Sequence, residues 1–263
     1  LRFVACKKIM EAFVTSEIKN SIAEITFGTP KSNSLPGHIL EKLAQTILDE
    51  GAKTEVKAIL LKSEGEKAFC GGASFDELLE IQDLETSKKF FGGFAKVLNA
   101  MRTCGKIVVV RVQGKTTGGG VGIACGADYC FATENASLAL TEINLGIGPF
   151  VIGPYVERKI GKSQFAAMAI DADFRSSDWA KTHNIYHSVS HTIEQMDEEI
   201  FSFLQKLSSR SSDALALIKK VSWEGTEHFS ELMPERIHMS ASLILEDSAK
   251  QNIEKIKERL RAK

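Results

Sequence analysis

The sequence predicts an α/β protein with a mostly parallel sheet, followed by a helical C-terminal region. Two observations predict this fold class. Short β-branched runs alternate with amphipathic helical stretches in the N-terminal half, and the strand signals fade after about residue 160. The chain has 263 residues, 43% hydrophobic and 25% charged, which is typical of globular proteins with a sizeable core. We expect an α/β core over residues 12–195 and a helical subdomain over 196–263.

The first predicted elements are a β-hairpin and a helix. Residues 13–15 and 22–27 alternate apolar and polar side chains around a turn at 19–21. Ile39, Leu43 and Ile47 then recur on one helical face, and Gly51 is expected to end this helix as its C-cap.

A strand–helix–strand unit follows the first helix. Residues 56–61 form an apolar run that predicts a buried strand, and 85–102 has the apolar spacing of a helix. Residues 107–112 are largely β-branched, which indicates a strand buried on both faces. This order of elements predicts parallel pairing of the two strands.

Helices dominate the C-terminal third. Helical patterns cover 194–207, 212–221 and 230 to the C-terminus. Charged residues crowd the segment 254–261, which we interpret as the solvated face of the last helix.

Charge and composition exclude several classes of partner. With 33 basic and 34 acidic residues the net charge is −1, which gives no electrostatic attraction to nucleic acid or to an anionic membrane. No apolar run approaches the roughly 18 residues of a membrane span, and no secretory signal is visible.

Cysteine and histidine spacings predict no metal site. The five cysteines are odd in number and lack paired ligand spacing, so we expect free thiols in a reducing, cytoplasmic environment. His183, His187 and His191 are spaced at i, i+4 without an HExxH pattern, which favours surface or capping roles.

Glycine is concentrated in one third of the chain. Fourteen of the 20 glycines lie between Gly71 and Gly153, with clusters at 71–72 and 114–122 that each lie between a strand and a helix. Neither cluster fits a dinucleotide fingerprint or a P-loop. Tight packing and an anion site formed by N–H donors of two loops, an oxyanion hole, are the two interpretations that remain.

Glu142 is the candidate proton-transfer residue. It follows an apolar run and precedes the Gly/Pro turn at 146–149. Burial against Ile143, Leu145 and Phe150 is expected to raise the pKa of its carboxyl group. The other interpretation is an ordinary acidic residue at a helix start.

Five motifs occur together in one order: 29–35, 67–73, 114–120, Glu142 and 146–149. In this order and spacing the chain resembles the crotonase superfamily, the enoyl-CoA hydratase/isomerase family. The resemblance implies a spiral of ββα turns, with C-terminal helices that pack on a neighbouring subunit in a homotrimer or hexamer. It also implies an acyl-CoA thioester as substrate, with no cofactor other than the coenzyme A of that thioester.

The resemblance also assigns roles to individual residues. Ala73 and Gly119 match the two oxyanion-hole positions, Glu142 matches the second acidic position, and Phe150 lies where it would reshape the acyl pocket. Coenzyme A is expected along a strip formed by Ala68, Ser74, Phe75 and Asp76.

The first acidic position of family hydratases is occupied here by Gly122. We therefore expect a hydratase in which Glu142 alone transfers protons, with Glu77 or Asp76 as the next candidates. A 3,2-enoyl-CoA isomerase, which needs only one carboxylate, is the alternative. A non-catalytic acyl-CoA-binding trimer is the second alternative.

Overall fold

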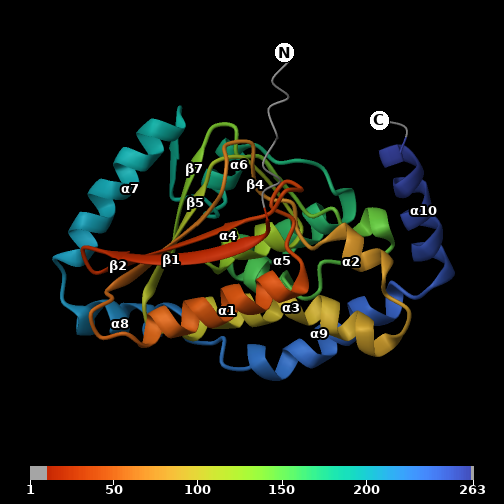
Figure 1. The fold of residues 1–263 in the computed structure, drawn as a ribbon, viewed down its shortest axis with the longest axis horizontal. Helices are drawn as coiled ribbons and strands as arrows, with labels where there is room; N and C mark the ends of the chain where they lie inside the picture. Colours follow the sequence, from red (N-terminus) through yellow and green to blue (C-terminus); the bar gives the residue numbers. More distant parts are fainter. Residues whose placement is uncertain (1–10, 262–263) are drawn as a thin grey trace, which may run out of the picture.

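The computed structural model describes residues 11–261, and its largest sheet starts with the N-terminal hairpin (Figure 1). The strand order is β1-β2-β3-β5-β7-β9. The six strands are β1 (Phe13–Lys19), β2 (Ile22–Gly28), β3 (Ala58–Ser63), β5 (Ile107–Val112), β7 (Tyr129–Thr133) and β9 (Ser188–Ser190).

The predicted hairpin and parallel pairing are confirmed. β1 and β2 pair antiparallel across Asn20 and Ser21, whose φ angles are 49° and 63°, as the tight turn of a two-residue hairpin requires. Every other pair in this sheet is parallel. β9 lies beyond the point where we expected strands to end.

Both faces of the sheet are covered, as predicted for 107–112. Val108 and Val110 face the core shared with α1 (Gly37–Ala52) and α3 (Leu84–Thr103). Ile107 and Val109 face the opposite core, which includes residues of α7 (Ile193–Ser208) and α8 (Ser212–Ser222).

A second, three-stranded parallel sheet is formed by β4 (Ala68–Cys70), β6 (Lys115–Thr117) and β8 (Leu138–Ala139). Each of these short strands follows a strand of the main sheet and precedes helical structure. The following helices are α2 (Phe75–Leu79), α4 (Gly119–Gly126), the 3₁₀ helix η1 (Glu142–Leu145) and α5 (Gly153–Asp171). This repeat confirms the spiral of ββα turns, and it brings three strand-to-helix junctions together.

The C-terminal region consists of α6 (Ser177–Thr182), α7, α8, α9 (Phe229–Leu243) and α10 (Asp247–Arg261). The helix expected from residue 230 to the end is therefore two helices, separated by a turn at 244–246. α9 packs against α3 and α10 against η1 of the same chain. The two helices thus cover part of their own core, and packing of the C-terminal helices on a neighbouring subunit stays a prediction.

Gly51 has a packing role and not the predicted capping role. It lies inside α1, whose C-cap is Lys53. A Cβ at Gly51 would lie 2.5 Å from the backbone oxygen of Cys104, so only glycine allows this close approach of α1 to the end of α3.

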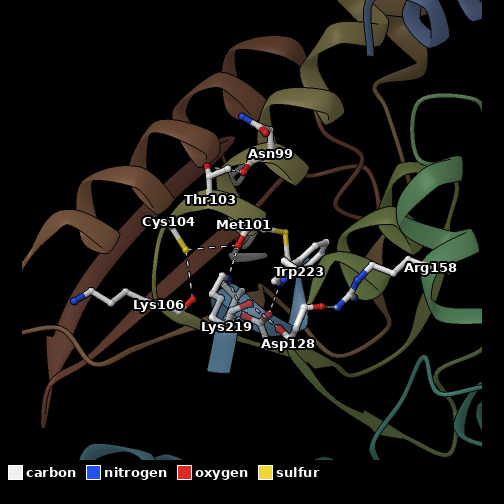
Figure 2. A network of polar contacts seen from close by, with 11 residues as sticks. Asn99, Met101, Thr103, Cys104, Lys106, Asp128, Arg158, Lys219 and Trp223 are labelled. Carbon is white, nitrogen blue, oxygen red and sulfur yellow. Dashed lines mark hydrogen bonds and ion pairs between the residues drawn. The ribbon is translucent and has the colours of Figure 1, made fainter. Parts of the chain in front are cut away.

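A buried polar network fixes α8 to the core (Figure 2). Lys219 Nζ donates to Asp128 Oδ2 at 2.8 Å and to the Met101 carbonyl at 2.6 Å. Asp128 also accepts hydrogen bonds from Trp223 Nε1 (2.7 Å) and from the Val108 amide (2.7 Å). The Lys219 and Asp128 side chains are 3% and 9% exposed, so each charge depends on the other for compensation.

Within residues 11–261 no helix is long and apolar enough to cross a membrane, and no group of three potential ligands gathers as a metal site requires. The cysteines of this part of the chain are buried free thiols, namely Cys70, Cys104, Cys125 and Cys130. Cys6 lies outside the described residues.

The three histidines differ in environment. His183 is the C-cap of α6, and His191 pairs with Glu134 at the surface. The surface or capping role predicted for His187 is wrong, because its ring stacks on Tyr129 and accepts a hydrogen bond from the Cys130 amide. Burial lowers the pKa of His187 to about 4.

Candidate active site

One cavity of about 740 Å³ lies where the strand-to-helix junctions meet α3, α9 and α10. Figure 1 shows α10 at the same end of the molecule as α2, and α7 at the opposite end. The wall of the cavity is formed in part by the two glycine loops, η1 and the segment 147–152. The cavity therefore brings together residues from Gly71 to Arg259, which are far apart in the sequence.

The first loop follows β4 and presents the Ala73 amide. The Leu35 amide donates to the Gly72 carbonyl (2.7 Å), and the Ser74 amide donates to the Leu35 carbonyl (3.0 Å). These bonds pin the loop on both sides of Ala73, while the Ala73 N–H has no acceptor among residues 11–261. Gly72 adopts a φ of +85°, a conformation that favours glycine.

The second loop follows β6 and presents the Gly119 amide. Gly118 has a φ of +52° and donates its N–H to the Ala139 carbonyl (3.1 Å). α4 begins at Gly119, whose N–H has no partner within the helix. The Gly119 amide is therefore one of the N–H donors at the positive end of the α4 dipole.

The two loops lie against each other. A Cβ built on Gly72 would be 3.7 Å from the Gly119 nitrogen and 3.3 Å from the Thr117 carbonyl. Ala73 and Gly119 both line the cavity. Two backbone donors from separate loops at one cavity are the arrangement that stabilises a developing oxyanion.

Glu142 begins η1 and lines the same cavity. Its carboxylate lies beside the second glycine loop, since a Cβ on Gly118 would be 3.2 Å from Glu142 Oε1. Oε2 is buried and has no hydrogen-bond partner among the described residues. Burial raises the pKa of Glu142 to about 7, well above its ordinary value.

The surroundings of Glu142 agree only in part with the sequence-based expectation. We expected burial against Ile143, Leu145 and Phe150. Leu145 and Phe150 line the cavity, whereas Ile143 is 46% exposed and points away from the core. Glu142 is the one acidic residue among those that line the cavity in the described part of the chain.

The space at Gly122 is filled by apolar side chains. A Cβ on Gly122 would lie 2.7 Å from Ile152 Cγ2, 2.9 Å from Ile152 Cβ and 3.3 Å from Leu98 Cδ1. No acidic side chain fits at this position while Ile152 keeps its place. The position of Ile152 therefore requires glycine at position 122.

Two of the four residues predicted for the coenzyme A strip line the cavity. Ser74 and Phe75 line the cavity, and the Ser74 side chain also caps α2 by accepting from the Glu77 amide. Ala68 and Asp76 lie outside the lining. The Ala68 carbonyl accepts from the Asn33 (2.9 Å) and Gln113 (3.1 Å) amide groups, and Asp76 pairs with Lys31 at the surface. Their role in coenzyme A binding stays a prediction.

Glu77, one of the two residues named as the next candidate bases, has another role. Its Oε2 accepts a 2.7 Å hydrogen bond from the Gly37 amide at the start of α1. The side chain thus caps a helix, and it lies outside the cavity lining.

Two groups of lining residues escaped the sequence analysis. Three phenylalanines of α3 form one wall: Phe90, Phe91 and Phe94. The Phe94 ring lies against Gly119, where a Cβ would be 2.3 Å from its Cζ atom. Helical spacing predicted Phe90 and Phe94 to lie on the apolar side of the helix, but it did not predict Phe91 and gave no sign that a cavity lies there.

The second group comes from α10. Asn252, Lys255, Ile256 and Arg259 follow the i, i+3, i+4, i+7 spacing of one helix face, and they line the cavity. We interpreted residues 254–261 as a solvated face. Lys255 and Arg259 are indeed exposed, yet they stand at the edge of the cavity.

Comparison with known proteins supports the family assignment. A sequence model of the enoyl-CoA hydratase/isomerase family matches residues 17–263. The short-chain-enoyl-CoA hydratase of Clostridium acetobutylicum is 32% identical over 168 residues, 61% of this chain and 64% of that protein. The match thus spans just under two thirds of that relative's length. The mitochondrial enoyl-CoA hydratase of Pongo abelii is 30% identical over 205 residues, 76% of this chain and 68% of the relative.

A solved structure shares the fold. The crystal structure of enoyl-CoA hydratase from Bacillus halodurans has a TM-score of 0.85 at 20% identity, covering 92% of this chain and 98% of that one. The family pattern extends from residue 17 to the end of the chain, and the fold agrees with it. The chain therefore belongs to the enoyl-CoA hydratase/isomerase family of the crotonase superfamily.

Proposed function

We propose that this chain is an enoyl-CoA hydratase that adds water to a 2-enoyl-CoA thioester through a stabilised enolate. One observation carries the proposal: one cavity contains two backbone donors that have no acceptor within residues 11–259, and a carboxyl group whose pKa is raised by burial to about 7. The amides of Ala73 and Gly119 would bind the thioester oxygen, and they bind it more strongly as it becomes negative. Glu142 would carry the proton.

The proposed reaction conserves all atoms of substrate and water. Glu142 takes a proton from water while the water oxygen bonds to C3, and the electrons of the C2=C3 bond move to the thioester oxygen as an enolate. The enolate then takes a proton at C2 from Glu142 and regenerates the carbonyl. The product is a 3-hydroxyacyl-CoA, and Glu142 returns to its ionised form.

The mouth of the cavity suits an anionic carrier. Lys255 and Arg259 are exposed cations at its edge, and phosphate groups such as those of coenzyme A are attracted to such a pair. The interior wall of Phe90, Phe91 and Phe94 suits the acyl chain.

A specific observation favours the isomerase alternative. Glu142 is the one carboxylate on the described cavity wall, and Ile152 fills the space at Gly122 where a second acid would be needed. A 1,3-proton shift requires one base that removes a proton at one carbon and returns it at another. The same amides would stabilise the enolate in this reaction.

A panel of coenzyme A thioesters tests the proposal. The chain is incubated with 2-enoyl-CoA and 3-enoyl-CoA substrates in ¹⁸O-labelled water, and the products are analysed by mass spectrometry. A labelled 3-hydroxyacyl product supports hydration, and a shifted double bond without label supports isomerisation. Thioester binding without any turnover would support the non-catalytic alternative.

The carrier assignment is tested with paired variants. Lys255→Ala with Arg259→Ala is expected to raise KM for coenzyme A thioesters but to leave KM for the phosphate-free pantetheine thioesters unchanged. Lys257→Ala is the matched control, because Lys257 pairs with Glu254 on the same helix.

A further inference from the structure

Ser240 is a polar residue on an otherwise aromatic wall of the cavity. It comes from α9 and is 1% exposed, and the α3 residues that line the cavity are Phe90, Phe91 and Phe94. Within residues 11–259 its hydroxyl group makes no hydrogen bond, although the nearby Ser87 and Ser242 hydroxyl groups do. Alanine would serve a helix interior at least as well, so the hydroxyl has no role in forming α9.

The neighbouring Ser87 has a different environment. Ser87 is also buried, but its hydroxyl donates to the Ala241 carbonyl (3.1 Å), which links α3 to α9. A buried hydroxyl normally has such a partner, because an unsatisfied polar group costs stability. Ser240 therefore differs from Ser87, because no residue within 11–259 uses its hydrogen-bonding capacity.

The position of Ser240 indicates which part of a ligand reaches it. The charged portion of an acyl-CoA belongs at the exposed mouth beside Lys255 and Arg259, and the thioester belongs at Ala73 and Gly119. Ser240 is buried and shares its wall with the phenylalanines, so the acyl chain is the part that extends there.

We infer that Ser240 is a specificity-determining residue, which selects acyl chains that carry a hydrogen-bonding oxygen beyond the reacting carbons. The inference rests on the proposed use of an acyl thioester. A hydroxyl or carbonyl oxygen on the chain would give Ser240 the partner that it lacks, whereas a plain alkyl chain would leave it unsatisfied. A net hydrogen bond of this kind changes relative affinity by about threefold to tenfold.

Calorimetric binding of matched ligands tests this inference. The ligands are saturated acyl-CoA thioesters of four to eight acyl carbons, each as a pair with a terminal methyl or a terminal hydroxyl group. For each pair, the Kd of the methyl ligand is divided by the Kd of the hydroxylated ligand. At one chain length this ratio is expected to be about threefold to tenfold larger for the wild type than for Ser240→Ala. Ser87→Ala is the matched control and should leave this ratio unchanged.

Thermal unfolding adds a second readout. Ser240→Ala removes a hydroxyl group that has no partner within residues 11–259 and should keep or raise Tm, whereas Ser87→Ala removes a hydrogen bond and should lower Tm.

The same affinity ratio in the wild type and Ser240→Ala at every chain length would overturn the inference, as expected if Ser240 only holds a water molecule. If the ratio shifts but no enoyl thioester is turned over, the proposed function fails and the inference stands. If neither ligand binds, both fail.

Discussion

At the scale of single residues, the burial of Glu142 links both activity and stability to pH. Its pKa is about 7 in the folded chain against an ordinary value of 4.5, so between these values the folded state binds more protons than the unfolded state. Stability is therefore expected to fall as pH rises from about 4.5 to 7. Activity should rise over the upper part of this range, because a base must be ionised to accept a proton.

Urea unfolding of the wild type and Glu142→Gln at several pH values between 4.5 and 8 measures this effect. The glutamine variant should lose the part of the pH dependence that comes from Glu142. An identical pH dependence of the unfolding free energy in both proteins would contradict the assigned burial.

The Gly119 donor is tested by two variants of the same position. Gly119→Pro removes the N–H, but any Cβ there also meets the Phe94 ring. Gly119→Ala keeps the N–H and introduces the same clash. We expect the proline variant to have about 10²–10³-fold lower kcat than the alanine variant, and equal rates in steady-state assays would exclude a role for this donor.

Individual site residues were predictable to different degrees. The glycine clusters at strand ends left an anion site as one of two interpretations, and the resemblance assigned Ala73 and Gly119 to it. The structure brings these two residues and Glu142 to one cavity. Ile152 was not predictable, because its effect on Gly122 depends on the contact of two helical segments that are 30 residues apart.

At the scale of elements, α8 depends on the buried pair Lys219–Asp128. Lys219→Met leaves the Asp128 carboxylate buried without its cation, which typically costs about 3–5 kcal/mol. Lys220→Met is the control, since Lys220 is the exposed neighbour on the same helix. Chemical denaturation should show a large loss of unfolding free energy for Lys219→Met and little change for Lys220→Met. Equal stabilities would mean that water compensates Asp128.

Element boundaries were predicted well where local signals are strong. The strand at 107–112 agrees with β5 at both ends, and the helix predicted at 85–102 differs from α3 by one residue at each end. The break between α9 and α10 was missed, because it contains no glycine or proline, only the turn at 244–246. The role of α10 in the cavity depends on how the chain folds back, which no local pattern encodes.

At the scale of the whole molecule, exposed apolar side chains predict self-association. Leu217, Ile218 and Val221 of α8 are each about 60% exposed, and Ile170 of α5 is 76% exposed. Apolar groups of this kind are typical of subunit contacts. We predict a trimer or a dimer of trimers, measured by analytical ultracentrifugation at micromolar concentration. A single monomeric species would contradict this prediction.

The architecture as a whole followed from alternation and motif order. Strand–helix–strand units predict parallel pairing, and the resemblance added the spiral of ββα turns, which the two sheets confirm. The contacts of α9 and α10 with their own core were not predicted, since an amphipathic helix gives no information on which subunit covers its apolar face.

The most direct test of Glu142 as the single proton carrier is deuterium exchange at C2 of a saturated acyl-CoA in D₂O, followed by NMR. Exchange requires only formation of the enolate. The test therefore applies whether the full reaction is hydration or isomerisation. The wild type should exchange this hydrogen, and Glu142→Gln should be slower by at least about 10²-fold while still binding the thioester. Undiminished exchange by Glu142→Gln would contradict the assignment.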